Sequence, residues 1–212
     1  MTFGLVFLAA RAAPAALVNG GFESPALAPN NFQTITPGTE PVGFAWLVAS
    51  GSVDIGHLPI SPFIDYSAYE GNQVLDLNGL TNGTVYQVFA TTPNQAYILS
   101  FAYADNSNEG GISTADIDVV DAVSLASLLS DSISHSTSTN GPPASADWTL
   151  YSQIFVATGA STRLTFTSTS ASTTASGGII IDAVAVNVPE PATWILLVVA
   201  GLSLLVARVR RR

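Results

Sequence analysis

The sequence contains no cysteine and no lysine. Without cysteine the chain has no disulfide, no thiolate nucleophile and no cysteine-ligated zinc. Five of the six basic residues lie near the ends of the chain, and Arg163 is the only one between residues 17 and 188. That segment, here called the body, holds 14 of the 15 acidic residues, so its net charge is near −13. Because phosphate backbones are bound mainly through Lys and Arg, nucleic acid is excluded as a partner.

Sequence motifs of common enzymes are also missing. The chain has no G-x-S-x-G elbow, P-loop, GxGxxG or H-E-x-x-H. Its two histidines, His57 and His135, fall in predicted loops, and neither stands beside a second ligand at metal spacing. Glycoside hydrolysis needs two acids at a defined separation across a cleft, and the body has too many acids for the sequence to single out a pair. We therefore expect a protein that is not an enzyme.

Residues 1–16 resemble a secretory signal peptide that has been cut short. Phe3–Ala10 is an apolar core, and Ala13 and Ala15 are small residues at positions typical of a cleavage site. The basic n-region is missing, because Arg11 follows the apolar core instead of preceding it. Either the start codon is placed too far downstream or the signal is weak, and both explanations predict export. An acidic surface suits an exported protein, since it favours solubility and is compatible with cations and neutral glycans.

The other end of the chain predicts a single membrane span. Residues 192–207 include no charged side chain, and a helix of this length covers about 24 Å. This is short of the roughly 30 Å hydrocarbon core, but arginine side chains can reach the interface from inside the bilayer. By the positive-inside rule the terminal arginines stay cytoplasmic and the body faces outward. These arginines, which act as the membrane stop, are Arg208, Arg210, Arg211 and Arg212.

Three successive features at this end resemble the PEP-CTERM sorting signal of Gram-negative bacteria. They are the apolar segment, the arginine cluster after it, and the motif before it, Val188, Pro189, Glu190 and Pro191. The resemblance implies that an exosortase recognises the motif while the tail is a transient anchor in the inner membrane. It further implies delivery to the cell surface or the extracellular matrix, with the mature protein either released or attached.

Alternation of apolar and polar residues runs through the body, with turn-forming residues at short intervals. The pattern predicts an all-β fold, a β-sandwich with jelly-roll connections. Ser- and Thr-rich residues 131–140 fit a long loop or an extra edge element. Residues 116–121 contain three Asp but lack the Gly and Glu of a calcium loop, so we interpret them as a strand with one solvated face. The predicted strands are Ala45–Ala49, Ser52–Gly56, Gln73–Leu77, Thr84–Thr91, Ala96–Ala104, Ala115–Leu125, Thr149–Ala157, Arg163–Thr169 and Gly178–Asn187.

The body also resembles galactose-binding-like β-sandwiches, and in particular the bacterial choice-of-anchor C proteins. The resemblance rests on the N-G-G-F-E opening at residues 19–23, on residues 71–79 and 85–97, and on the final segment 179–186. It implies that Glu23 and Asp182 help to hold a structural Ca²⁺, because the first and last strands of such a sandwich lie side by side. The alternative is a pair of solvated acids at a sheet edge.

Aromatic and acidic residues gather in the predicted loop 56–70. Rings that stack on a pyranose, next to acids that bond its hydroxyl groups, are typical of sugar sites. Ordinary packing is the alternative, and for Trp46 and Trp148 we expect core positions. The candidate sugar-contacting residues are Phe63, Tyr66, Tyr69, Asp65 and Glu70.

The sequence therefore predicts three parts: a signal segment at 1–16, a β-sandwich at 17–188 and a sorting signal at 189–212. The predicted function is binding of a polysaccharide, such as the cell's own exopolysaccharide, by an exported surface or matrix protein. The alternative is a structural adhesion or biofilm-matrix protein that acts through protein–protein contacts. The identity of the ligand stays open.

Overall fold

Eleven β-strands make up the part of the chain that the structure describes. The computed structural model describes residues 17–60, 66–106, 112–136, 148–171 and 177–189. The strands are β1 (Asn31–Ile35), β2 (Leu47–Ser50), β3 (Val53–His57), β4 (Gln73–Asp76), β5 (Thr84–Ala90), β6 (Ala96–Asp105), β7 (Ser113–Asp121), β8 (Ser127–His135), β9 (Thr149–Val156), β10 (Ser161–Ser168) and β11 (Ile179–Asn187).

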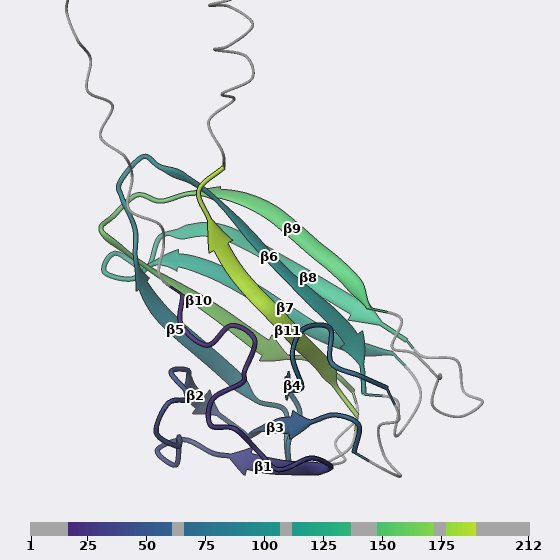
Figure 1. Cartoon of the computed structure of the whole chain (residues 1–212). Coiled ribbons are helices and arrows are strands. Elements are labelled where there is room, and N and C mark those ends of the chain that lie inside the picture. Colours follow the sequence, from purple (N-terminus) through teal and green to yellow (C-terminus); the bar gives the residue numbers. More distant parts are fainter. Residues whose placement is uncertain (1–16, 61–65, 107–111, 137–147, 172–176, 190–212) are drawn as a thin grey trace, which may run out of the picture.

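The strands form two antiparallel sheets that pack face to face (Figure 1). The six-stranded sheet has the order β1-β3-β4-β11-β6-β9, and the five-stranded sheet the order β2-β5-β10-β7-β8. From β4 onward the chain crosses to the other sheet at each connection except the one from β7 to β8. Such alternation is the connectivity of a jelly roll. The predicted all-β sandwich is therefore confirmed.

The core lies between the sheets and is built by the period-two pattern. In β10 the buried Leu164 and Phe166 alternate with the half-buried Arg163 and Thr165. Trp46 packs on the Phe166 ring at 6.0 Å between centroids and is 1% exposed, which confirms its predicted core position. β7 alternates in the same way and has one solvated face, as its Asp-rich sequence predicts.

A second, smaller apolar cluster lies on the opposite side of the six-stranded sheet. Strands β4, β6 and β11 turn one row of side chains to the main core and the other row to this cluster. The segment that follows β3 covers the second row. The buried members of the cluster are Leu58, Ile60, Tyr66, Val74, Ala104 and Ile180.

The N-terminal segment is fixed against the last strand. The amide of Val184 donates a hydrogen bond to the carbonyl of Gly20 at 2.9 Å, next to a β-bulge between Asp182 and Ala185. A Cβ atom at Gly20 would lie 1.9 Å from the carbonyl oxygen of Val184, so only glycine permits this approach. The bulge and the N-terminal turn together place Glu23 near Asp182.

All nine predicted strands are present, with ends displaced by a few residues. Of the two further strands, β1 was not predicted, and β8 was predicted only as one of two alternatives. β1 lies at one edge of the six-stranded sheet, and β8 at one edge of the five-stranded sheet. β8 overlaps the Ser-rich segment 131–140, so an edge element is the correct alternative for residues 131–135; residues 137–140 lie outside the described ranges.

The predicted signal segment 1–16 and the predicted helix at 192–207 lie outside the described residues, as do Glu190, Pro191 and the terminal arginines. Val188 and Pro189 are described, and Val188 packs partly against the main core. No helix occurs in the described ranges, so none there could span a membrane.

Candidate functional site

An exposed aromatic surface lies beside the smaller apolar cluster. Tyr69, in the turn before β4, meets Trp148, in the segment before β9, at 6.1 Å between ring centroids and an interplanar angle of 68°. The Trp148 indole N–H also donates to the carbonyl of Ser67 at 3.3 Å. Edge-to-face rings fix each other's orientation, and 47% of Tyr69 remains exposed. We call Tyr69 and Trp148 the aromatic patch.

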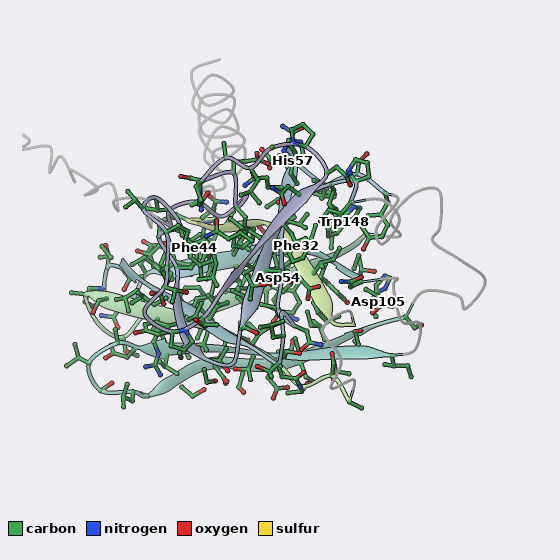
Figure 2. All side chains as sticks on the ribbon, turned by 90° about the horizontal axis from the view of Figure 1, so that it is seen from below. Phe32, Phe44, Asp54, His57, Asp105 and Trp148 are labelled. Carbon is green, nitrogen blue, oxygen red and sulfur yellow. The ribbon has the colours of Figure 1, made fainter. Side chains whose placement is uncertain are left out.

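Tyr66 supports this patch from below and is not part of its surface. It is 2% exposed, its ring packs edge-on against Trp148 at 6.3 Å, and its hydroxyl donates to the carbonyl of Asp105 at 2.7 Å. Tyr66 thus contacts both Trp148 and Asp105, which lie on the same side of the molecule in Figure 2. The expectation that Tyr66 stacks on a sugar therefore needs correction, because neither face of its ring is free.

Trp148 departs from its predicted core position, because it is only half-buried at the edge of the small cluster. The other candidate residues are distributed as follows. Glu70 is exposed next to Tyr69, whereas Phe63 and Asp65 lie outside the described residues. The aromatic patch is thus made of one predicted residue and one that the sequence assigned to the core.

Two carboxylates hold the turn that presents Tyr69. One oxygen of Glu23 accepts hydrogen bonds from the backbone amides of Asn72 and Gln73, at 2.6 and 2.8 Å. Asp182 accepts one from the amide of Glu70 at 2.9 Å. The turn therefore depends on both residues that the resemblance assigned to calcium.

These two acids lie close enough to act on each other electrostatically. Burial raises the pKa of Asp182 to about 7, and the negative charge of Glu23 contributes to the rise, although backbone hydrogen bonds oppose it. Like charges that share a partly buried site are stabilised by a cation or a proton. The predicted proximity of Glu23 and Asp182 is thus present in the structure.

Gly71 links the acids to the aromatic patch. It has φ +63°, and a Cβ atom there would lie 2.2 Å from the Glu23 carboxylate oxygen. Only glycine can pass so close to the carboxylate in this left-handed conformation. The sequence Tyr69-Glu70-Gly71 therefore makes one structural unit, with a ring on one side and a carboxylate cradle on the other.

A buried polar network that the sequence analysis missed lies beneath Tyr66. Asp76 is buried and accepts hydrogen bonds from the side-chain amide of Asn106 at 2.6 Å and from the backbone amide of Asn78 at 2.8 Å. Burial raises the pKa of Asp76 to about 7. The signal was present in the sequence as Asp76 and Asn78 at the end of an apolar strand. Polar residues in such a position favour turns, and here they close the end of β4.

No group of three or more His, Cys, Asp or Glu side chains that could hold a metal ion occurs within the described ranges. Any cation between Glu23 and Asp182 would accordingly need backbone carbonyl oxygens as further ligands. His57 instead donates from Nδ1 to the carbonyl of Leu27 at 2.9 Å, a contact that ties β3 to the N-terminal segment.

Comparison with known proteins places the body in a family. A family model described as "Protein of unknown function (DUF642)" matches residues 15–187. The chain belongs to the DUF642 family. The match covers both Glu23 and Asp182 as well as the aromatic patch, so all candidate residues of this DUF642 chain described above lie within the family region. No curated protein matches the chain.

Solved structures similar to this DUF642 chain include the carbohydrate-binding module TmCBM61 in complex with β-1,4-galactotriose. It is 14% identical, with 84% of this chain and all of the module covered and a TM-score of 0.49. The CBM22-1 xylan-binding domain of Paenibacillus barcinonensis Xyn10C is 13% identical over 79% of this chain and all of the domain, with a TM-score of 0.45. The arabinose-bound α-L-arabinofuranosidase MgGH51 is 13% identical over 83% of this chain and 26% of the enzyme, with a TM-score of 0.49.

Proposed function

We propose that this DUF642 protein is an exported, non-catalytic polysaccharide-binding protein whose ligand contacts the aromatic patch. The observation behind this proposal is the Tyr69–Trp148 pair, an exposed aromatic surface whose geometry is fixed by packing and hydrogen bonds. Rings held in this way offer apolar faces to the C–H groups of a pyranose without a large loss of side-chain entropy. The exposed acid Glu70 lies next to Tyr69, where it can accept hydrogen bonds from sugar hydroxyl groups.

Charge narrows the class of polysaccharide. The body has a net charge near −13, and the exposed Glu70 stands next to the aromatic patch. A polyanion such as a polyuronate would be repelled by this side of the molecule. The ligand is therefore a neutral glycan.

Calcium has a structural part in this proposal. Glu23 and Asp182 fit the chemistry of a calcium site, because they provide two carboxylates that repel each other and calcium prefers oxygen ligands. Bound calcium would neutralise the pair, and the turn that presents Tyr69 would gain rigidity. The role of calcium is stabilisation, since neither Glu23 nor Asp182 belongs to the aromatic patch that contacts the ligand.

The route to the cell surface follows from the ends of the chain. The segment at 1–16 directs export, and an exosortase recognises the motif Val188-Pro189-Glu190-Pro191 while residues 192–207 anchor the protein in the inner membrane. The protein then acts at the cell surface or in the extracellular matrix. Detection of the mature ends by mass spectrometry of the secreted protein tests this route, and recovery of the intact chain from the cytosol would overturn it.

A second candidate function, adhesion through protein–protein contacts, is favoured by one observation on β9. Leu150, Ile154 and Val156 are each at least 50% exposed on the outer side of this edge strand. The strand has no charged residue and no Pro, the features that usually protect a sheet edge from pairing. Self-association of the purified body would support adhesion.

Retention on immobilised neutral glycans tests the polysaccharide proposal. We expect the body to be retained on at least one glycan of a panel with galactan, xylan and mixed-linkage β-glucan. The double variant Tyr69→Ala/Trp148→Ala should weaken retention at least about tenfold, because each lost stacking contact contributes on the order of 1 kcal/mol. Phe32→Ala is the matched control, since it removes an exposed aromatic ring on β1 that is not part of the patch. Failure of the wild-type body on every glycan would overturn the proposal.

A further inference from the structure

The outer face of the five-stranded sheet carries aromatic, basic, acidic and hydroxyl side chains, most of them half-buried. Its outward side chains stand between residues of the main core, which fixes their direction: Val85, Leu164 and Ile117 are buried neighbours on β5, β10 and β7. The side chains of interest, here called the sheet face, are Tyr86, Asp116, Asp118, Ser130, Arg163 and Thr165.

Four of these residues form a straight row across the sheet. Tyr86 on β5 is in register with Thr165 on β10, Thr165 with Asp118 on β7, and Asp118 with Ser130 on β8. Three steps between strands make the row about 14 Å long. An aromatic ring, two hydroxyl groups and a carboxylate therefore follow one another across the strands.

Arg163 stands beside this row and adds a cationic group to it. It is the only basic residue of the body, and its guanidinium lies over the Tyr86 ring at 5.8 Å from the centroid. Within the part of the chain that the structure describes, its Nε is buried and has no hydrogen-bond partner, so a ligand would be met by the terminal N–H groups of the guanidinium. The ring contact holds the guanidinium against the sheet without using its N–H groups.

Asp118 on β7 is diagonal to Arg163 on the neighbouring strand β10, but its hydrogen bond goes to Ser130. Arg163 is in register with Val120, two residues along β7 from Asp118. One carboxylate oxygen of Asp118 accepts a hydrogen bond from the Ser130 hydroxyl at 2.9 Å. A donor group and an acceptor group thus share the outer face of this sheet next to an aromatic ring.

We propose that the sheet face is a second binding surface for neutral polysaccharide, so that one molecule cross-links two glycan chains. A sugar with vicinal hydroxyl groups both donates and accepts, which matches Arg163 and Asp118 together. A polyanion would pair with Arg163 but would be repelled by Asp116 and Asp118. The inference takes its class of ligand from the proposed function. It adds a second binding site, the sheet face, and a second activity, the cross-linking of glycan chains.

The two surfaces lie on opposite sides of the sandwich. The aromatic patch belongs to the cluster on the outer side of the six-stranded sheet, whereas the sheet face is the outer side of the other sheet. A single glycan chain cannot lie flat on both sides at once. Occupation of both surfaces by different chains therefore joins them, and matrix cohesion would gain from the two-site avidity.

Native mass spectrometry with an oligosaccharide of a glycan that retains the body tests the number of sites. We expect two equivalents on the monomeric wild-type body, one on Arg163→Gln/Tyr86→Ala, one on Tyr69→Ala/Trp148→Ala and none on the combined variant. Ser132→Ala, on the same exposed face of β8, is the control and should keep two. If Arg163→Gln/Tyr86→Ala does not fold, Thr165→Ala and Arg163→Lys provide the same comparison, with weaker binding of the second equivalent expected.

Viscosity of the matching soluble polysaccharide tests cross-linking. The wild-type body should raise the viscosity, and each double variant should lose this effect while still binding one equivalent. The inference is overturned if the wild type binds one equivalent that the Tyr69/Trp148 variant removes, in which case the proposed function stands. Binding of no oligosaccharide would overturn both. Two equivalents on the Arg163/Tyr86 variant, or its undiminished viscosity effect, would also overturn the inference.

Discussion

Asp54 and Asp76 lie directly opposite each other on the antiparallel strands β3 and β4, so both side chains are on the same face of the six-stranded sheet. Burial raises the pKa of each carboxyl, that of Asp76 to about 7, and the charge of Asp54 adds to the rise at Asp76. Within the described residues, Oδ1 of Asp54 is buried without a hydrogen-bond partner. The folded chain therefore keeps protons here that the unfolded chain releases.

We predict that Asp54→Asn stabilises the fold at pH 8 and has little effect at pH 4. The pKa of Asp76 is higher in the folded chain, about 7, than the ordinary value of 3.8. The stability that the protonated Asp76 contributes is therefore fully present below pH 3.8 and is lost as the pH rises to about 7. Asn cannot ionise and no longer repels Asp76. Thermal unfolding at the two pH values should show a rise in midpoint of several degrees, on the order of 5 °C, at pH 8 alone.

Asp116→Asn, which removes a carboxyl from an exposed sheet face, is the control for this comparison. It should leave the difference between pH 4 and pH 8 unchanged. An equal rise in midpoint for Asp54→Asn at both pH values would contradict the role of ionisation.

We predict that calcium raises the thermal midpoint of the wild-type body and that Glu23→Gln or Asp182→Asn abolishes this rise. Each variant removes one of the two carboxylates that would neutralise the ion. The effect of calcium should also diminish as the pH falls below about 7, because Asp182 then gains a proton. Melts with excess calcium and with chelator measure it. Glu40→Gln, an acid outside the site, is the control, and an absent shift in the wild type would contradict the prediction.

We predict that Gly71→Ala weakens glycan retention although residue 71 has no side chain that could touch the ligand. The new Cβ would clash with the Glu23 carboxylate and displace the turn that presents Tyr69. Gly38→Ala is a matched control, because Gly38 also has a positive φ but a Cβ there meets no atom within 4 Å. Retention assays on the same glycan should therefore separate the two variants, and equal retention would argue against a link between turn and patch.

We predict that Gln73→Leu lowers the free energy of unfolding by about 3 kcal/mol. The buried side-chain amide of Gln73 donates to the carbonyls of Phe22 and Pro25 and accepts from the amide of Leu27. Leucine would leave these three backbone groups without their partner. Urea unfolding measures the loss. The same change at the exposed Gln153 should cost less than about 0.5 kcal/mol, and a similar loss at both positions would contradict the argument.

The strands that the sequence predicted share a clear alternation, whereas the two further strands, β1 and β8, lack one. In β8 only Ile133 is buried, and the strand is held by its register with β7 rather than by its own apolar face. In β1 the aromatic Phe32 is 51% exposed and gives no inward signal. Edge strands of this kind depend on neighbours that are distant in the sequence, which a local pattern cannot show.

The candidate site was predictable where it depends on short segments. The proximity of Glu23 and Asp182 followed from a resemblance over both ends of the body. The burial of Tyr66 and the partial exposure of Trp148 did not, because they depend on contacts with Asp105 and with the turn at residues 67–69, far from Trp148 in the chain. Long-range hydrogen bonds thus determine that Tyr66 is buried and that Trp148 lies at the surface beside Tyr69.

The position of the last strand has a mechanical consequence. β11 is hydrogen-bonded to β4 on one side and to β6 on the other, and its Val184 also holds the N-terminal segment. A pull applied through residues beyond Asn187 would load these ladders in shear, along the strand, so that many hydrogen bonds must fail together instead of opening one at a time. A body attached by that end would resist tension from a moving cell or a stretched matrix before any of its sheets came apart.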